Sequence, residues 1–251
     1  MVFRCLLMTC AFGVGLLGSA AAFAQQSQPA SALSPSQRAE VIGLIRQELV
    51  QDPSILRDAI GALQAQDQAS QASAQSNAIA ASRAALIDNA ADPVIGNRKG
   101  DVTVVEFYDV RCPYCRQMRP LLVTLAQQDP GVRVVFKDIP ILGPSSVVGA
   151  RALLAAQMQG GYDKMQAALM SDPAPATEAS LRMAATQIGL NPDRLIHDMS
   201  DATITNKLAE NAALAQTLGV TGTPALIVGG RLVPGAVSLD DLHKLVNSAR
   251  G

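Results

Sequence analysis

Apolar residues recur along the chain at two spacings, which separate extended from helical segments. Residues 102–107 and 132–137 form continuous apolar runs with the length and β-branched content of buried strands. Two shorter runs, 225–228 and 231–233, are joined by Gly229-Gly230, a sequence that predicts a β-hairpin. We therefore expect a sheet whose strands come from both sides of a long intervening segment.

That intervening segment, residues 145–218, has the spacing of helices throughout. Asp172-Pro173-Ala174-Pro175 and Gly189-Leu190-Asn191-Pro192 interrupt it, as turn residues do. The predicted pieces are 146–159, 162–170, 178–188, 192–199 and 202–218, and Ser238 caps a last helix at 239–249. The pattern predicts an α/β domain over residues 91–251 that carries a helical insertion.

A separate helical region precedes this domain, over residues 25–63. Ser34, Pro35 and Gln37 form a helix start, and an apolar stripe at spacings of three and four follows it. The pattern restarts after Asp52-Pro53. The stripe comprises Val41, Ile42, Ile45, Leu49, Ile55, Leu56, Ile60 and Leu63. Such helices either fold back on their own domain or pair with other copies, and the spacing favours self-association.

Residues 64–90 connect the two parts. Between 64 and 82, 16 of 19 residues are Gln, Ala or Ser. Ala and Gln favour helix while Ser opposes it weakly, so one reading is a partly helical linker that changes shape. The alternative is a solvated spacer.

The N-terminus has the pattern of a cleaved signal peptide over residues 1–24. Arg4 precedes an uncharged apolar stretch, and Ala22-Phe23-Ala24 fits the small-x-small cleavage rule. The alternative is an uncleaved membrane anchor. Cleavage would remove Cys5 and Cys10 and leave two cysteines in the mature protein. Export places the protein in a compartment where disulfides form, and a bacterial signal implies the periplasm.

Those two cysteines lie in Cys112-Pro113-Tyr114-Cys115, between the first predicted strand and a predicted helix. A helix N-terminus carries partial positive charge and free N–H groups, which stabilise a thiolate on Cys112. Cys115, one turn later, can attack a mixed disulfide and release the partner. The motif therefore predicts thiol–disulfide exchange with no cofactor beyond the redox-active pair.

Other uses of the pair are disfavoured. A closed zinc site needs four ligands, and downstream of the signal segment there is no second cysteine pair and only His197 and His243. The formal charge is −1, aromatic residues make up 3% of the chain, and no basic run occurs, so nucleic-acid binding is not indicated.

Two further features accompany the dithiol. Glu106 lies inside an apolar strand six residues before Cys112, where a carboxylate is costly unless it has a partner or a task. It could take the proton of Cys115, or it could form a structural ion pair with Lys137 at the end of the second strand. Thr223-Pro224 precedes a central strand, a place where proline is unusual, and a cis peptide bond would explain it.

The chain has an acidic residue within a strand, then a CxxC motif at a helix start, and then a Thr-Pro pair before a later strand. This order resembles the thioredoxin superfamily. The signal segment and helical insertion resemble its DsbA-like periplasmic disulfide oxidoreductases. Residues 33–40, Asp52-Pro53, Ala62-Leu63-Gln64 and residues 140–146 look like the suppressor-of-copper-sensitivity protein C group. The resemblance implies a thioredoxin-like core with a helical insertion, preceded by an N-terminal α-helical oligomerisation region.

The resemblance also implies roles. Cys112 would be the nucleophile and Cys115 the resolving thiol, with Glu106 and Lys137 as further catalytic candidates. Pro113, Tyr114, Thr223 and Pro224 would bind substrate. The expected function is a periplasmic disulfide isomerase for misfolded exported proteins, with a membrane redox partner and a homo-oligomeric, preferentially trimeric, state. The alternatives are a dithiol oxidase, or a copper-tolerance protein that binds Cu(I) through Cys112 and Cys115.

Overall fold

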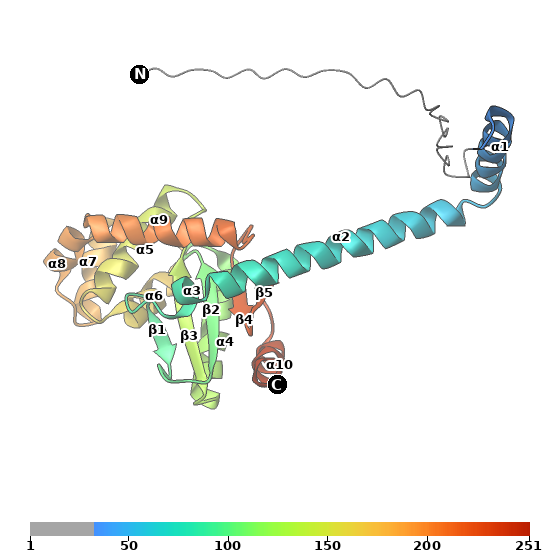
Figure 1. Ribbon diagram of the computed structural model, residues 1–251. Helices are drawn as coiled ribbons and strands as arrows, with labels where there is room; N and C mark the ends of the chain where they lie inside the picture. The colour runs from blue at the N-terminus through green and yellow to red at the C-terminus, as the bar shows by residue number, and fades with distance from the viewer. Residues whose placement is uncertain (1–32) are drawn as a thin grey trace, which may run out of the picture. The chain divides into compact units, whose positions relative to one another are not determined.

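The computed structural model describes residues 33–251 and divides between Ala62 and Leu63 into two units (Figure 1). The predicted signal segment, with Cys5 and Cys10, lies outside the described residues. Among residues 33–251, none of the helices combines the length and the apolar character needed to cross a bilayer.

The N-terminal unit is helical, as the stripe predicts. Helix α1 (Pro35–Gln51) begins at Ser34, whose side chain accepts from the Gln37 backbone while Gln37 caps Ser34 in return. Helix α2 (Ser54–Ala81) follows the Asp52 turn, where the Asp52 carboxylate accepts from the Ser54 backbone at 3.0 Å. No residue of α1 is buried. The apolar stripe of this unit is therefore open to solvent.

Helix α2 continues past the unit boundary through the Gln/Ala/Ser-rich residues, so that segment is helical as far as Ala81. Residues 64–74 are all exposed, and local propensity alone holds them in a helix. From Gln75 onward the helix contacts its own unit: Gln75 Nε2 donates to the Leu218 carbonyl, and Ile79 is buried. Ile79 and Leu86 thus belong to the core of the C-terminal unit.

The C-terminal unit is built on a five-stranded sheet in the order β1-β3-β2-β4-β5. Strands β2 and β3 pair in parallel, and the other pairs are antiparallel. The strands are β1 (Val94–Gly96), β2 (Val102–Tyr108), β3 (Val132–Asp138), β4 (Ala225–Val228) and β5 (Arg231–Pro234). The β4–β5 hairpin turns at Gly229-Gly230, both with positive φ, as a two-residue loop requires. Only β1 was not predicted.

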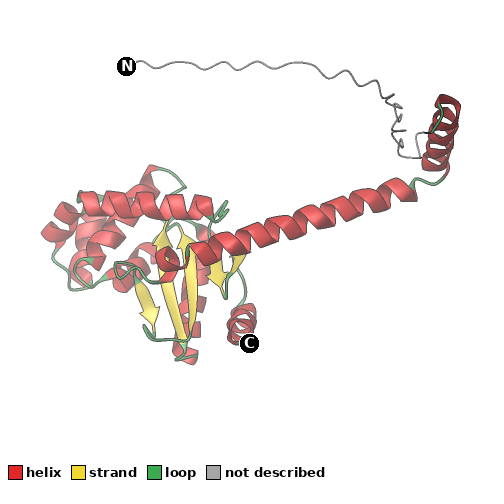
Figure 2. Cartoon of the chain, in the orientation of Figure 1, coloured by secondary structure: helices red, strands yellow, loops and turns green. Residues whose placement is uncertain are grey.

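Helices cover both faces of this sheet (Figure 2). Helices α4 (Pro113–Gln128) and α10 (Leu239–Arg250) pack on one face. Helix α3 (Arg83–Ile87), the end of α2 and α9 (Ala202–Thr217) pack on the other. The insertion comprises α5 (Pro144–Gln157), α6 (Tyr162–Ser171), α7 (Glu178–Gln187), α8 (Pro192–Asp198) and α9. These helices confirm the predicted pieces to within two residues at each end.

Candidate active site

The dithiol sits where β2 ends and α4 begins. Cys112 is the N-cap of α4 in an extended conformation, and Pro113 occupies the first helical position. Neither of these two cysteines is in a disulfide; Cys112 is 4% exposed and Cys115 is fully buried. Pro113 and Tyr114 are exposed beside them. A partner disulfide therefore reaches the Cys112 sulfur before that of Cys115.

Asp109 holds the backbone around the dithiol, a role that the sequence analysis missed. Its carbonyl accepts from the Cys112 N–H at 2.9 Å. One carboxylate oxygen accepts from Arg111 N, and the other accepts from Ile141 N and Leu142 N. The buried carboxylate thus ties the loop after β3 to the start of α4. Its position directly after the predicted strand was the available signal.

The two thiols differ in their electrostatic surroundings. Burial raises the pKa of the Cys115 thiol, and the nearby Glu106 and Cys112 raise it further. Cys115 is therefore a thiol at neutral pH, and it must lose a proton before it can attack a disulfide. Cys112 instead lies at the N-terminus of a 16-residue helix, where backbone N–H groups are unpaired and the helix dipole is positive.

The Thr223–Pro224 loop faces the dithiol, as predicted. The peptide bond is cis, and the Thr223 carbonyl accepts from Cys112 Sγ at 3.2 Å. Two segments separated by more than 100 residues in the sequence therefore meet at the reactive sulfur. A loop with free backbone groups at this position can pair with an extended chain.

Glu106 lies behind the dithiol, 1% exposed, on the sheet face covered by α4. Burial raises its pKa well above the usual range, and the charges of Cys112 and Asp138 raise it further while Arg119 lowers it. Its Oε1 has no hydrogen-bond partner within the described residues. A carboxyl in this position can hold or accept a proton close to Cys115.

The expected pairing of Glu106 with Lys137 is wrong. The parallel register places Lys137 opposite Phe107, so its side chain points to the other face of the sheet from Glu106. There Lys137 Nζ donates to the Asp92 carboxylate, and to the Ala85 carbonyl at 2.6 Å. Lys207 binds the second oxygen of Asp92. Lys137 therefore belongs to a buried ion cluster that ties α3 and α9 to the sheet.

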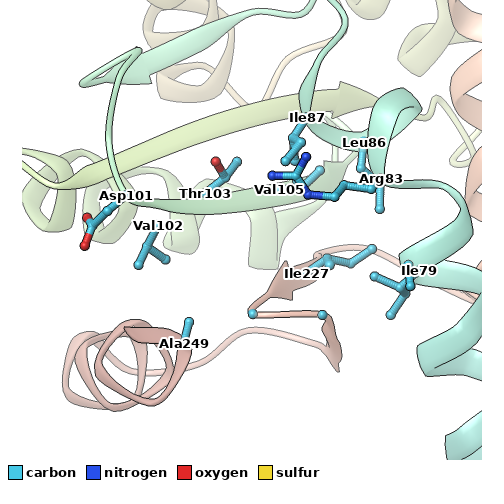
Figure 3. A pocket seen from close by; sticks show the side chains of 13 residues that line it. Ile79, Arg83, Leu86, Ile87, Asp101, Val102, Thr103, Val105, Ile227 and Ala249 are labelled. Carbon is cyan, nitrogen blue, oxygen red and sulfur yellow. The ribbon is translucent and has the colours of Figure 1, made fainter. Parts of the chain in front are cut away.

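A cavity of about 370 Å³ opens on that same opposite face (Figure 3). The apolar part of its lining includes Ile79, Leu86, Val105 and Ile227. Val105 and Ile227 alternate with the residues that face α4, so this cavity is separated from the dithiol by the sheet. It is not part of the exchange site.

Comparison with known proteins agrees with this geometry. The model of the DSBA-like thioredoxin domain matches residues 103–247, which include the dithiol, the helical insertion and the Thr223–Pro224 loop. The chain belongs to this family. The matched domain is that of a DSBA-like thiol–disulfide oxidoreductase, and it contains Cys112 and Cys115.

Two solved structures illustrate how far the similarity extends. A thioredoxin-like oxidoreductase from Silicibacter pomeroyi DSS-3 is 43% identical, with a TM-score of 0.64, over 67% of this chain and 97% of that one. Proteus mirabilis ScsC in a transitional conformation is 33% identical, with a TM-score of 0.64, over 87% of this chain and 97% of that one. The DSBA-like chain thus resembles ScsC beyond the domain itself.

The first curated relatives that match this chain are much longer proteins. The Na⁺/H⁺ antiporter NhaA 1 of Salinispora arenicola is 32% identical over 165 residues, which are 65% of this chain and 25% of the antiporter. The DSBA-like chain therefore spans about a quarter of the length of the curated relatives that it matches first.

Proposed function

We propose that this oxidoreductase is an exported disulfide isomerase that works as a homo-oligomer, with a trimer favoured. The observation that carries the proposal is the open apolar stripe of the N-terminal unit. Its exposed large apolar side chains are Val41, Ile42, Leu44, Ile45, Val50, Ile55, Leu56 and Ile60. A helical stripe of this size in water is stabilised by burial against other copies of the same helices. The match to ScsC covers 87% of this chain and so extends beyond the DSBA-like domain.

Isomerisation follows from the chemistry of the dithiol. The Cys112 thiolate attacks a wrong disulfide in the substrate, forms a mixed disulfide and releases a substrate thiolate. That thiolate can attack another substrate disulfide, which reshuffles the bonds and finally frees Cys112. When reshuffling stalls, Cys115 gives its proton to Glu106, attacks Cys112 and releases the substrate.

Each catalytic event needs a substrate that stays close while its bonds change. Several dithiol domains held together by the N-terminal helices raise the effective concentration of thiols around one misfolded chain. The substrates in this proposal are exported proteins with wrong disulfides, in the periplasm. A membrane redox partner would return the dithiol to its reduced form.

The test is a charge placed in the stripe of the full-length mature protein. Ile45→Glu combined with Ile60→Glu should convert the oligomer to a monomer, because burial of two carboxylates opposes association. Refolding of a scrambled multi-disulfide protein should fall several-fold, while reduction of a small disulfide should keep its rate. Light scattering gives the mass, and Gln47→Glu, on the same exposed helix, is the matched control.

Two results would contradict the proposal. One is a monomeric wild-type protein. The other is a double variant that becomes monomeric yet refolds the scrambled protein as fast as the wild type does. The second result would favour the alternative functions, a dithiol oxidase or a protein that binds Cu(I) through the cysteine pair.

A further inference from the structure

A buried ring of three oxygen-bearing side chains lies at the end of the strand that carries Glu106. Tyr108 and Asp138 are register partners at the ends of β2 and β3, and Tyr162 reaches them from α6. All three are buried. Because side chains alternate along a strand, Tyr108 points to the same face as Glu106, two residues earlier. The ring therefore occupies the same layer as the dithiol.

The contacts in the ring determine how many protons it holds. Tyr108 Oη lies 2.7 Å from Asp138 Oδ1, Tyr162 Oη lies 2.7 Å from Asp138 Oδ2, and the two hydroxyl oxygens are 2.5 Å apart. Each contact at this distance needs one hydrogen between its oxygens. The two hydroxyls supply two hydrogens, so the third must be a proton on Asp138. Each side chain then donates once and accepts once.

The charge of Asp138 matters to Glu106. Asp138 raises the pKa of Glu106, and burial raises the pKa of Asp138 itself to about 7. An ionised Asp138 therefore opposes ionisation of Glu106, and a protonated one permits it. The polar groups that surround the two carboxyls are Asp109 after β2, Cys112, Cys115 and Arg119 from α4, Gln166 from α6 and Asn211 from α9.

We propose that Asp138 is a positioning residue that acts on Glu106 through its charge. Asp138 is neutral while the tyrosine ring holds its third proton. Once that proton is lost, the charge of Asp138 raises the pH at which Glu106 can accept the proton of Cys115. In that step the Cys115 S–H proton passes to the Glu106 carboxylate. The Cys115 sulfur bonds to Cys112, the bond from Cys112 to the substrate breaks, and the substrate leaves as a thiolate. The inference rests on the proposed role of Glu106 in this release step.

The test is the pH profile of release, measured by stopped flow from about pH 5 to about pH 9 with a saturating disulfide peptide. Asp138→Asn preserves the ring, because an amide can donate to one tyrosine and accept from the other, but it carries no charge. The midpoint of its profile should move to lower pH. At the wild-type midpoint the release rate should rise several-fold, because the variant lacks the charge that Asp138 acquires when the ring loses its proton.

A second variant keeps the test independent of how well Asp138→Asn folds. An ionised Asp138 accepts from both tyrosine hydroxyls, and Tyr162→Phe removes one of these donors. Asp138 should then keep its proton to higher pH, and the midpoint should move in the same direction as in Asp138→Asn by a smaller amount. The control is Asp198→Asn, which neutralises another buried carboxylate in α8, bound to Arg194, and should leave the profile unchanged.

Glu106→Gln separates this inference from the one on which it rests. Slower release in Glu106→Gln, with no added effect of Asp138→Asn in that background, is the expected coupling. If Glu106→Gln slows release but neither Asp138→Asn nor Tyr162→Phe moves the midpoint, the role of Asp138 is overturned. If Glu106→Gln leaves release unchanged, both roles are overturned.

Discussion

Glu106 and Cys115 are two acids that share a dry environment behind the reactive sulfur. Burial raises the pKa of each, the charge of Glu106 raises the pKa of Cys115 further, and the charges of Cys112 and Asp138 raise the pKa of Glu106. The proton affinity of the Glu106 carboxyl therefore changes when a neighbouring charge changes. Formation of a mixed disulfide makes that change, because it removes the negative charge of Cys112, which raises the pKa of Glu106. Under the proposed function, this change favours the Glu106 carboxylate at the release step, where it would accept the proton of Cys115.

The same acid should cost stability, and the cost should depend on pH. The pKa of Glu106 is raised in the folded protein, so above its usual value of 4.5 the unfolded chain loses the proton first. The free energy of unfolding then falls as pH rises, by about 1.4 kcal/mol for each pH unit until the folded pKa is passed. Glu106→Gln should therefore stabilise the protein more at pH 8 than at pH 5.

Urea denaturation at both pH values measures this difference. Glu178→Gln is the control, because Glu178 is exposed and pairs with Arg182 on the surface. An equal gain for Glu106→Gln at the two pH values would show that Glu106 titrates in the folded protein as it does in the unfolded chain.

The residues whose placement in the fold agrees with the prediction are those that local motifs define. Cys112, Cys115 and Pro224 are recognised from four-residue patterns and from the strand or helix beside them. Which face of β3 carries Lys137 depends on the register between β2 and β3, and no local pattern gives that register. The ring of Tyr108, Asp138 and Tyr162 depends on the same register and on a helix 24 residues further along. Side-chain contacts that depend on the register between strands could therefore not be predicted from local sequence patterns.

At the scale of elements, one buried ion cluster joins four pieces of the fold. Lys137 of β3 binds Asp92, just before β1, and the Ala85 carbonyl of α3, while Lys207 of α9 also binds Asp92. Lys137 is 1% exposed, so its charge is satisfied only by these partners. The cluster replaces the ion pair with Glu106 that the sequence suggested, and it lies on the far side of the sheet from the dithiol.

Lys137→Met should therefore affect stability and not chemistry. Breaking a buried pair costs about 3–5 kcal/mol, and Lys207 remains to compensate part of the Asp92 charge, so we expect about 3 kcal/mol. Thermal unfolding measures the loss, and Lys244→Met, at an exposed pair with Asp241, should cost much less. A several-fold fall in the rate of peptide reduction, measured well below the unfolding temperature, would instead place Lys137 in the exchange machinery.

The boundaries of the inserted helices were predictable because polar and special residues define them. Asn191 and Asp201 cap α8 and α9 with their side chains, and Pro144 and Pro192 begin α5 and α8. Strand β1 was missed because it is three residues long, too short to show an alternating pattern. Strand β1 forms because it pairs in antiparallel orientation with the backbone of β3, along the edge of β3 that β2 leaves free.

At the scale of the whole molecule, the Gln/Ala/Ser-rich part of α2 connects two units with different tasks. Under the proposed function, its length sets how far a dithiol can reach from the shared N-terminal helices. Deleting about two helical turns, residues 66–72, should leave the mass of the assembly unchanged and lower the rate of isomerisation several-fold. Replacing the same residues by alanine is the control, because it keeps both length and helix.

Light scattering and refolding of a scrambled protein measure the two properties of this variant separately. An unchanged isomerisation rate after the deletion would mean that the distance between a dithiol and the shared N-terminal helices does not limit the rate. A smaller assembly would mean that these residues also take part in association.

The exposed stretch of α2, residues 64–74, also bears on how this chain can change over evolutionary time. All of those side chains are exposed, so the packing of the C-terminal unit does not depend on them. Between Arg57 and Arg83 the sequence contains no lysine or arginine. Insertions and deletions in this stretch therefore leave the hydrophobic core and the buried ion pairs of the C-terminal unit unchanged. Homologous proteins should vary in length at this place more than inside the sheet, so selection can adjust the spacing of the catalytic units while the active site stays the same.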